Sequence, residues 1–405
     1  MLHQPVPLYP CAVRSGLVRA VVAALVLALV TYVASTALLD AWHRSQEVET
    51  SGPPRLPDLL YNAPESVATT ERRGPVGPVA AVFAGTRVLD GLVGDLDDPW
   101  IAVSSRTGDY RAISGPDLPA ATPGGVAVSS DGELVAWAGD DELVVHETVT
   151  GGNRVLQAPG ITAVGAFAPD DARLLVQAGE LRVVDVLADA QVSALGEVPD
   201  RAVAQAVWHP DGTTISLVDG RLVEIDVASG RRTSSPVGVS ADAQLAWSPA
   251  GDRLVSLQEI SGAQRLQIWE RGPEGRVSTG GPAPAEGIAL KHLLGFTDDG
   301  SVAVAALALE SGTITRVFEV PVDDAGSVAE IGQLPGPGDN WVGAETLEVA
   351  ADALRGGTAS FDEPRWPWSH LAKLSSSLIL ALFALGMYLT RPPRYRRRRR
   401  RRPEV

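Results

Sequence analysis

Three aspartates that lie close together in the sequence are the first candidates for chemistry. They are Asp95, Asp97 and Asp98, and a second acidic pair follows at 140–141. Carboxylate oxygens are the ligands that Ca²⁺ prefers, and the ion takes six to eight of them. The spacing matches no EF-hand loop, so an ordinary acidic loop is the competing interpretation. We expect no metal or cofactor, and keep the three aspartates as candidate Ca²⁺ ligands.

The histidines offer no metal or catalytic pattern. They are His3, His43, His146, His209, His292 and His370. None has the close spacing to another histidine, or to the single cysteine, Cys11, that zinc ligands show. His209 falls in a recurring turn, where Ser248 and Ala168 hold the equivalent positions, so we expect it to be structural. No nucleophile elbow, phosphate loop or dinucleotide fingerprint occurs, and no catalytic or cofactor-binding residue is predicted.

The charges of the chain are divided sharply along its length. Residues 45–366 hold 47 acidic and 21 basic side chains, although the whole chain has a net charge of only −15. A segment this acidic repels nucleic acid, so no nucleic-acid partner is expected. The basic residues near the C-terminus are Arg391, Arg394, Arg396, Arg397, Arg398, Arg399, Arg400, Arg401 and Arg402. Beside a membrane they would contact anionic lipid.

Two apolar runs are long enough to cross a membrane as helices. Residues 20–39 contain no charge, and twenty helical residues span a hydrocarbon core of about 30 Å. A cleaved signal peptide is the alternative for this run. Residues 374–390 form a second charge-free run, which extends to 368 if Lys373 snorkels. Trp366 and Trp368 would then be interfacial aromatic anchors. The alternative for the second run is a buried helix of a soluble domain.

The basic residues predict the orientation of both spans. Lys and Arg next to a span stay on the cytoplasmic side, which places the C-terminal arginines inside. Arg14 and Arg19 place the N-terminus inside as well. The two predictions agree and put residues 40–367 outside the cytoplasmic membrane. The Arg-rich, Lys-poor composition further suggests a bacterial cell-envelope protein.

The middle of the chain contains an internal repeat. Each copy is a short apolar strand followed by a turn rich in Asp, Gly and Pro. The copies are VAVSSDG at 126–132, AFAPDD at 166–171, AVWHPDG at 206–212, LAWSPAG at 245–251 and LGFTDDG at 294–300. The spacings of 39, 41, 39 and 49 residues approach the roughly 40–45 residues of a four-stranded propeller blade. The long interval has a Gly/Pro-rich run at 271–287, which we interpret as a loop insertion.

Each repeat continues with the pattern of further strands. Period-two apolar alternation begins at Glu142, Glu180, Arg221 and Arg265, and Gly-containing turns lead to a fourth strand. Such blades cover one another by stacking around an axis. Residues 79–115 read as a degenerate first blade with 100–105 as an inner strand, and 341–361 as half a blade that pairs with it to close the ring. The sequence predicts an all-β fold of six or seven blades flanked by two transmembrane helices.

The turns at 209–212 and 248–251 resemble those of the WD-repeat and TolB-type β-propeller families. The resemblance covers roughly residues 79–361, although the Gly-His and Trp-Asp dipeptides of typical WD repeats are missing. The predicted organisation is a cytoplasmic N-terminus (1–19), a transmembrane helix (20–39), a Pro-rich stalk (40–78), the propeller (79–361), a second transmembrane helix (368–390) and a cytoplasmic Arg-rich tail (391–405).

Three functions are compatible with these features. The resemblance implies a rigid, non-enzymatic platform that binds protein partners in the membrane or envelope. A propeller enzyme with a central-channel site, similar to lactonases or cyclases, is the main alternative. A ligand sensor ranks last, because no cytoplasmic domain is predicted to receive a signal. The partner, the ligand and the biological process cannot be read from the sequence.

Overall fold

The computed structural model divides the chain into two compact units. One unit contains Met1–Trp42 and Trp368–Val405, and the other contains His43–Pro367. The residues that the structure describes are 11–44, 48–61, 67–85, 87–90, 94–97, 99–120, 124–188, 190–198, 203, 205–260, 263–272, 275–280, 289–298, 300–307, 314–322, 328–333, 346–362 and 370–390.

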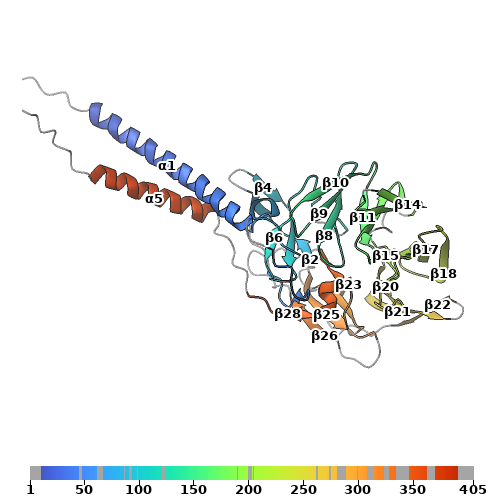
Figure 1. Ribbon diagram of the computed structural model, residues 1–405. Helices are drawn as coiled ribbons and strands as arrows, with labels where there is room; N and C mark the ends of the chain where they lie inside the picture. Colours follow the sequence, from blue (N-terminus) through green and yellow to red (C-terminus); the bar gives the residue numbers. More distant parts are fainter. Residues whose placement is uncertain are drawn as a thin grey trace, which may run out of the picture. The chain divides into compact units, whose positions relative to one another are not determined.

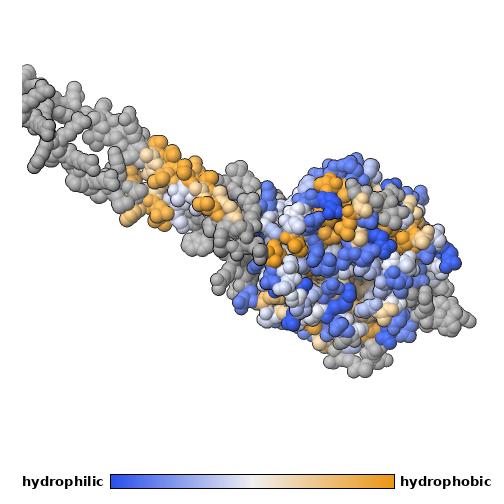
Figure 2. Space-filling model, viewed as in Figure 1, coloured by the Kyte–Doolittle hydropathy of each residue, from blue (hydrophilic) through white to orange (hydrophobic). Residues whose placement is uncertain are grey.

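The first unit consists of two helices in its described residues (Figure 1). Helix α1 spans Cys11–Arg44 and helix α5 spans His370–Thr390. Their apolar side chains are largely exposed, with Leu29 at 55% and Phe383 at 65%. Figure 2 shows hydrophobic side chains over much of the described part of this unit. Tyr32 and Ala381 are exceptions, at 2% and 3% exposed.

The second unit is a six-bladed β-propeller. Each blade is a four-stranded sheet, and neighbouring strands are antiparallel. From the axis outward, the first blade contains β27 (Leu347–Val349), β2 (Val79–Ala84), β5 (Trp100–Ser104) and β6 (Tyr110–Ala112), and the second contains β7 (Ala127–Val128), β8 (Leu134–Ala138), β9 (Glu142–Glu147) and β10 (Asn153–Gln157). The third contains β11 (Ala163–Phe167), β12 (Arg173–Ala178), β13 (Glu180–Asp185) and β14 (Ala190–Gly196), and the fourth contains β15 (Val207–Trp208), β16 (Thr214–Val218), β17 (Arg221–Asp226) and β18 (Arg232–Gly238). The fifth contains β19 (Gln244–Trp247), β20 (Arg253–Ile260), β21 (Ala263–Gly272) and β22 (Gly275–Gly280), and the sixth contains β23 (Ala289–Phe296), β24 (Val302–Leu307), β25 (Ile314–Val320) and β26 (Ala329–Gln333).

The innermost strands close a ring around the propeller axis. Strand β7 neighbours β11, and contacts continue through β15, β19, β23 and β27 back to β7. The C-terminal strand β27 pairs with the N-terminal strand β2, with Ala81 opposite Val349. The prediction of a propeller closed by both ends of the chain is confirmed, and the number of blades is six. Figure 1 shows the blades following one another in sequence colour around this ring.

Two strands differ from the sequence prediction. Strand β5, expected as an inner strand, is third from the axis because β27 and β2 occupy the two inner places. The run at 271–287, expected as a loop insertion, contains β22, which pairs with β21 as the fourth strand of its blade. The sequence of this strand is rich in Gly and Ser, which pack poorly on a pleated sheet and so have a low β-propensity. The sequence therefore did not indicate a strand here.

The recurring turns join the innermost strand of a blade to its second strand. We call them the inner turns. Their last residues are Gly132, Asp171, Gly212, Gly251 and Gly300, and all have φ between 52° and 84°. Glycine adopts this left-handed region without a steric penalty, and aspartate tolerates it better than most residues. The sequence repeat therefore reflects a single backbone conformation used five times.

The core lies between the faces of neighbouring blades. Trp100, Trp137 and Trp269 are fully buried there. Each indole nitrogen has an acceptor: Pro119 O at 3.2 Å, Pro116 O at 3.0 Å and Ser256 Oγ at 2.9 Å, respectively. Because an unpaired buried donor costs about 1–3 kcal/mol, these bonds allow tryptophan to fill the core.

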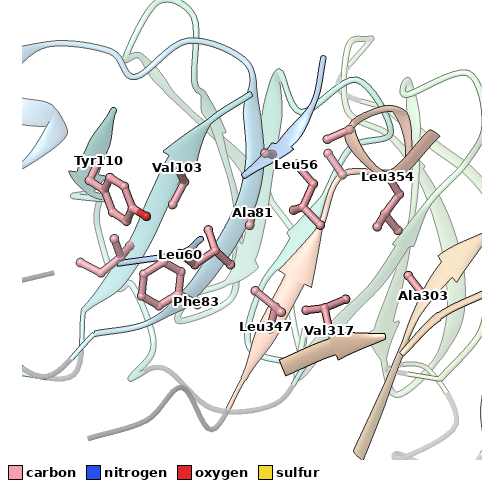
Figure 3. Close-up of a cluster of buried hydrophobic side chains, with 14 of the residues drawn as sticks. Leu56, Leu60, Ala81, Phe83, Val103, Tyr110, Ala303, Val317, Leu347 and Leu354 are labelled. Atoms are coloured by element: carbon pink, nitrogen blue, oxygen red, sulfur yellow. The ribbon is translucent and has the colours of Figure 1, made fainter. Parts of the chain in front are cut away.

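The segment expected as an extended stalk instead packs on the propeller in its described residues. Strand β1 (Leu56–Pro57) pairs in parallel with β28 (Thr358–Ala359), and Leu59 bridges Gln333 of β26. Leu56 and Leu60 are buried at 2% and 3% exposed. Figure 3 shows both among core side chains of β2, β24, β25 and β27. We call residues 55–61 the strap.

Three further elements complete the described residues. Helix α2 (Thr70–Arg73) has Thr69 as its N-cap, whose side chain accepts from the Arg72 amide. Helix α4 (Ala351–Arg355) follows β27 and contributes Leu354 to the core. Strands β3 (Arg87–Asp90) and β4 (Gly94–Asp97) form a separate hairpin. Thr69 also bridges Ala112 of β6, so the chain before the propeller contacts the first blade as well as the last.

Candidate functional site

The structure gives no support to a calcium site at the three predicted aspartates. Asp95 and Asp97 belong to the β4 strand, opposite Leu89 and Arg87 of β3. Asp98 lies outside the described residues. Within the part of the chain that is described, no group of three or more His, Cys, Asp or Glu side chains could hold a metal ion. The Ca²⁺ site stays a prediction from the sequence.

The membrane-proximal residues named from the sequence also lie outside the described residues. They are Trp366, Trp368 and the arginines from Arg391 to Arg402. The first apolar run is described: residues Val21–Leu38 of α1 form a window that is long and apolar enough to cross a membrane. A helix of this kind near the N-terminus is typical of a membrane anchor or a signal sequence.

His209 has the structural surroundings expected from the repeat. Its ring lies 4.5 Å from that of Trp247 in an edge-to-face arrangement. Its Nε2 lies 3.1 Å from the carbonyl oxygen of Gly251, in the inner turn of the next blade. Its Nδ1 lies 3.0 Å from Asp211 Oδ2. With both ring nitrogens engaged within the turns, His209 links two blades.

Polar side chains on the innermost strands are the feature of the described residues that best fits a binding site. Glu348 on β27 lies two residues before the N-cap of α4. Ala127, Val207 and Ala246 lie two residues before the first residue of their inner turns, so they are the equivalent positions of their blades. The innermost strands run side by side around the axis, so these equivalent positions lie at one height. Glu348 is thus the acidic side chain at a level that other blades fill with small or apolar residues.

The surroundings of Glu348 disfavour its charge. The residue keeps part of its surface exposed, but burial of the carboxyl raises its pKa to about 7. Burial is the whole cause, because transfer of a carboxylate from water penalises the charged form. No ion pair or hydrogen bond holds this carboxyl among the described residues. A charge that costs free energy and has no partner is a common feature of functional sites.

A second group of polar residues lies two positions back along the chain, on the innermost strands or just before them. Gln244 on β19 reaches β23: its Nε2 donates to Lys291 O at 3.1 Å, and its Oε1 accepts from Leu293 N at 2.7 Å. The same Nε2 lies 3.3 Å from His292 Nδ1. Burial, followed by the charge of Lys291, lowers the pKa of His292 to about 4, so the imidazole is neutral.

Three polar atoms of this axial group are buried without a hydrogen-bond partner. They are Gln205 Oε1, His292 Nε2 and Thr346 Oγ1. Thr346 is fully buried, at 0% exposed. More than nine in ten buried polar groups in native proteins are paired, so each of these unpaired atoms calls for an explanation. We call Gln205, Gln244, His292, Thr346 and Glu348 the axial polar group.

The sequence contained a signal for part of this group. Residues 347–353, LEVAADA, align with the five repeats and place Glu348 where the others have Ala, Val or Gly. Their turn lacks the final glycine, because helix α4 replaces the inner turn after β27. The copy that carries the charged residue therefore lacks the turn by which the other five repeats are recognised. His292 has no other metal ligand close to it in the sequence, so its spacing carries no signal of this group.

Comparison with solved structures finds distant similarity to β-propeller proteins. The β-propeller domain of the Trilobed protease from Pyrococcus furiosus is 13% identical over 71% of this chain and 86% of that chain, with a TM-score of 0.44. A putative TolB from Agrobacterium tumefaciens is 14% identical over 51% and 78%, with a TM-score of 0.40. Hydrazine synthase from Kuenenia stuttgartiensis is 18% identical over 54% and 68%, with a TM-score of 0.39.

These similarities concern the fold alone. No family model matches the chain, and no curated protein matches it. The chain is a six-bladed β-propeller with an apolar N-terminal helix, distantly similar in structure to TolB and other propeller proteins. Membership in the WD-repeat or TolB family stays a prediction.

Proposed function

We propose that the chain is a membrane-anchored propeller that serves as a non-enzymatic binding platform for proteins on the outer face of the cytoplasmic membrane. The observation that carries this proposal is helix α1, which joins an apolar span with exposed side chains to a folded propeller. Exposed Leu and Val side chains over 18 residues cost free energy in water, and a bilayer removes that cost.

The second span supports the same topology. Helix α5 presents Ile379, Leu380, Leu382 and Phe383 with exposed fractions of 57–65%, as α1 does with its own apolar residues. Arginines follow α5 in the sequence and precede the apolar part of α1. By the positive-inside rule both termini are cytoplasmic, and the propeller is extracytoplasmic.

The acidic propeller suggests the chemistry of a partner. The inner turns and α4 place an aspartate in every blade: Asp131, Asp170, Asp211, Asp252, Asp298 and Asp352. These residues surround the axis on one face, because all inner turns lie at the same end of the strands. Several are offset locally, as Asp170 is by Arg173 at 2.7 Å. The proposed partner is a protein with a basic surface.

The topology is tested by labelling cysteines in intact cells with a maleimide that cannot cross the membrane. Cys11 is the only cysteine and lies on the N-terminal side of the span. We expect it to be protected until the cells are lysed. In a Cys11→Ser background, Ala228→Cys, at an exposed propeller position, should be labelled at once. Labelling of Cys11 in intact cells would contradict the orientation, and its loss from the mature chain would establish a cleaved signal sequence.

The platform is tested with the full chain solubilised in detergent as bait. Asp211→Asn with Asp298→Asn removes two charges from the inner turns, and both residues are exposed. The control is Asp140→Asn with Glu259→Gln, which removes two exposed charges near hairpins at the opposite ends of the strands. We expect a stoichiometric partner whose retention falls with salt and with the first pair only. Equal retention by both pairs would contradict an acidic docking face.

A further inference from the structure

We propose that the outer edge of strand β10 binds an extended, basic peptide segment of a protein partner, which adds to the blade as a fifth strand. We call the fourth strand of each blade its outer strand, and β10 is the outer strand of the second blade (Figure 1). This edge lies at the rim of the propeller and is separate from the inner turns of the platform proposed above. Main-chain hydrogen bonds would supply the affinity, and the side chains beside the edge would supply the specificity.

Strand β10 presents a regular row of main-chain groups at its outer edge. Its register against β9 has no bulge along the whole strand. Glu147 and Gly152 are the next opposite pair of this register, and Glu147 N donates to Gly152 O at 2.8 Å. Hydrogen-bonded and non-hydrogen-bonded pairs alternate along an antiparallel ladder, so the even-numbered residues of β10 bond β9. The N–H and C=O groups of Asn153, Val155 and Gln157 therefore point away from β9, and no described residue is hydrogen-bonded to those main-chain groups.

The other outer strands are covered or irregular. Two are covered by the chain itself: Ala112 N of β6 donates to Ala68 O at 3.0 Å, and Gln333 N of β26 donates to Asp58 O at 2.9 Å. Strands β14 and β18 have irregular registers, and β18 also contains Pro236. Strand β22 has glycine at both ends. Proteins protect sheet edges with features of this kind, and β10 shows none of them within the described residues.

The two covered edges demonstrate that an outer strand of this propeller accepts an extended segment. Gln333 of β26 donates to Asp58 O and accepts from Leu60 N, both at 2.9 Å, so the strap bonds it on two sides. Leu59 lies opposite Gln333 in a parallel bridge. The side chain of Leu60 is buried, at 3% exposed, which shows that such a segment also contributes packing. A segment added to β10 would repeat this arrangement with a chain from another protein.

The side chains beside β10 favour apolar residues in the middle of the segment. Outside α1 and α5, the described residues expose three large apolar side chains: Val155 at 42%, Leu187 at 58% and Ile260 at 37%. Val155 is the central residue of β10. Arg154 points to the opposite face of the strand, and its Nη1 donates to Leu187 O at 3.3 Å. Two of the three exposed apolar residues therefore lie beside this one strand.

The charges near β10 favour a basic segment over a second copy of this chain. Glu142 lies directly opposite Gln157, whose Nε2 donates to Glu142 Oε1 at 2.7 Å. Asp141 precedes Glu142 and is exposed. A lysine at the matching end of an added segment would lie near these carboxylates, and opposite charges on neighbouring strands attract. Two copies would instead bring together domains that each hold 47 acidic and 21 basic side chains in residues 45–366, and these repel each other.

The test uses the full chain in detergent and a short fluorescent peptide of alternating Thr and Val with Lys at both ends. The control peptide is methylated on every Thr and Val main-chain nitrogen, so it cannot pair as a strand. Fluorescence anisotropy should show saturable binding of the first peptide only. We expect Val155→Lys to weaken binding by about tenfold, because a charged side chain at the centre of an edge opposes pairing. Ile260→Lys makes the same change at another exposed apolar residue and should bind as the parent does.

Strand pairing is distinguished from surface contact by amide hydrogen exchange. The amides of Asn153, Val155 and Gln157 should exchange more slowly when the peptide is bound. Val155→Thr keeps a β-branched residue and should keep most of the binding. Circular dichroism of each variant should retain the β-sheet signal of the parent chain.

Four results would overturn the proposal: no saturable binding, equal binding of the methylated peptide, unchanged binding by Val155→Lys, or dimers of the parent chain that Val155→Lys abolishes. The last result would assign the edge to a second copy. Asp211→Asn with Asp298→Asn, the pair that tests the acidic docking face, should bind the peptide as the parent does. The two proposals therefore fail separately.

Discussion

The amide nitrogen of Ser130 donates a 2.6 Å hydrogen bond to Oδ1 of Asp171, which lies in the inner turn of the next blade. Asp171 is the residue that replaces glycine in the repeat, with φ at 52°. The left-handed turn is therefore kept at this position, and its side chain ties two blades together. The same carboxyl is partly buried, and that burial raises its pKa to about 6, against hydrogen bonds that lower it.

Asp171→Asn is expected to stabilise the protein at pH 7 by about 1 kcal/mol. Asparagine tolerates the left-handed region and keeps an acceptor for Ser130, while it removes the cost of a partly buried charge. Because its pKa is raised, Asp171 keeps its proton in the native state between pH 3.8 and about 6, where it has lost the proton in the unfolded state. The stability that this protonation contributes is therefore fully present below pH 3.8 and is lost as the pH rises through 6. Urea unfolding of the full chain at pH 4 and pH 7 measures it.

The control for this prediction is Asp171→Ala, which has neither the acceptor nor the tolerance for positive φ. It should lower the free energy of unfolding at both pH values by about 1–2 kcal/mol. A destabilising Asp171→Asn at pH 7 would mean that the charge of Asp171 contributes more than its desolvation costs.

Gly132→Ala should be far more destabilising than Gly220→Ala, although both glycines have positive φ. A Cβ at Gly132 would clash with the backbone oxygen of Val79, and only a movement of β2 would relieve the clash, whereas a Cβ at Gly220 would meet nothing within 4 Å. We expect a loss of roughly 1 kcal/mol at Gly220 from backbone strain and at least twice that at Gly132. Chemical denaturation compares the two, and equal losses would show that β2 can yield.

The strap should contribute to the stability of the propeller although it lies outside the blades. Leu56→Ala and Leu60→Ala each remove a buried side chain from the cluster shown in Figure 3 and should cost about 2–5 kcal/mol. Leu187→Ala is the control, because Leu187 is 58% exposed and should change the free energy of unfolding by less than about 0.5 kcal/mol. Losses at Leu56 as small as at Leu187 would restore the view of this segment as a linker.

The repeats explain how far the sequence predicted the fold. The turn ending at Gly132, Gly212 or Gly251 demands positive φ, which few residues adopt, so the turn remains visible in the sequence. The strap had no such signal. Leu56 and Leu60 lie among prolines and polar residues, and pair with strands about 270–300 residues away. Long-range pairing of a short segment leaves no periodicity.

The axial polar group was only partly predictable for a related reason. The position of Glu348 on the propeller axis is known only after the ring places β27 next to β23 and β7. The spacing of single residues in the sequence does not reveal that placement. Gln244 and His292 are 48 residues apart, yet their side-chain nitrogens are separated by 3.3 Å. Blade stacking brings together residues that lie one repeat apart, so a site on the axis is distributed over the whole domain.

Glu348→Gln should reverse part of the dependence of stability on pH. The native pKa of Glu348 is raised from 4.5 to about 7, so its contribution to stability is present below pH 4.5 and lost as the pH rises to 7. His292 acts in the opposite direction, because its native pKa is lowered from 6.5 to about 4, so its contribution is present above pH 6.5 and lost as the pH falls toward 4. In the parent chain the two slopes offset each other between pH 4.5 and 6.5.

The Gln variant should therefore gain stability steadily over that range and exceed the parent at pH 8. Unfolding measured from pH 4 to 8, with His292→Asn to remove the opposite slope, checks both signs, and a parallel pair of curves for parent and Glu348→Gln would show that the carboxyl is solvated.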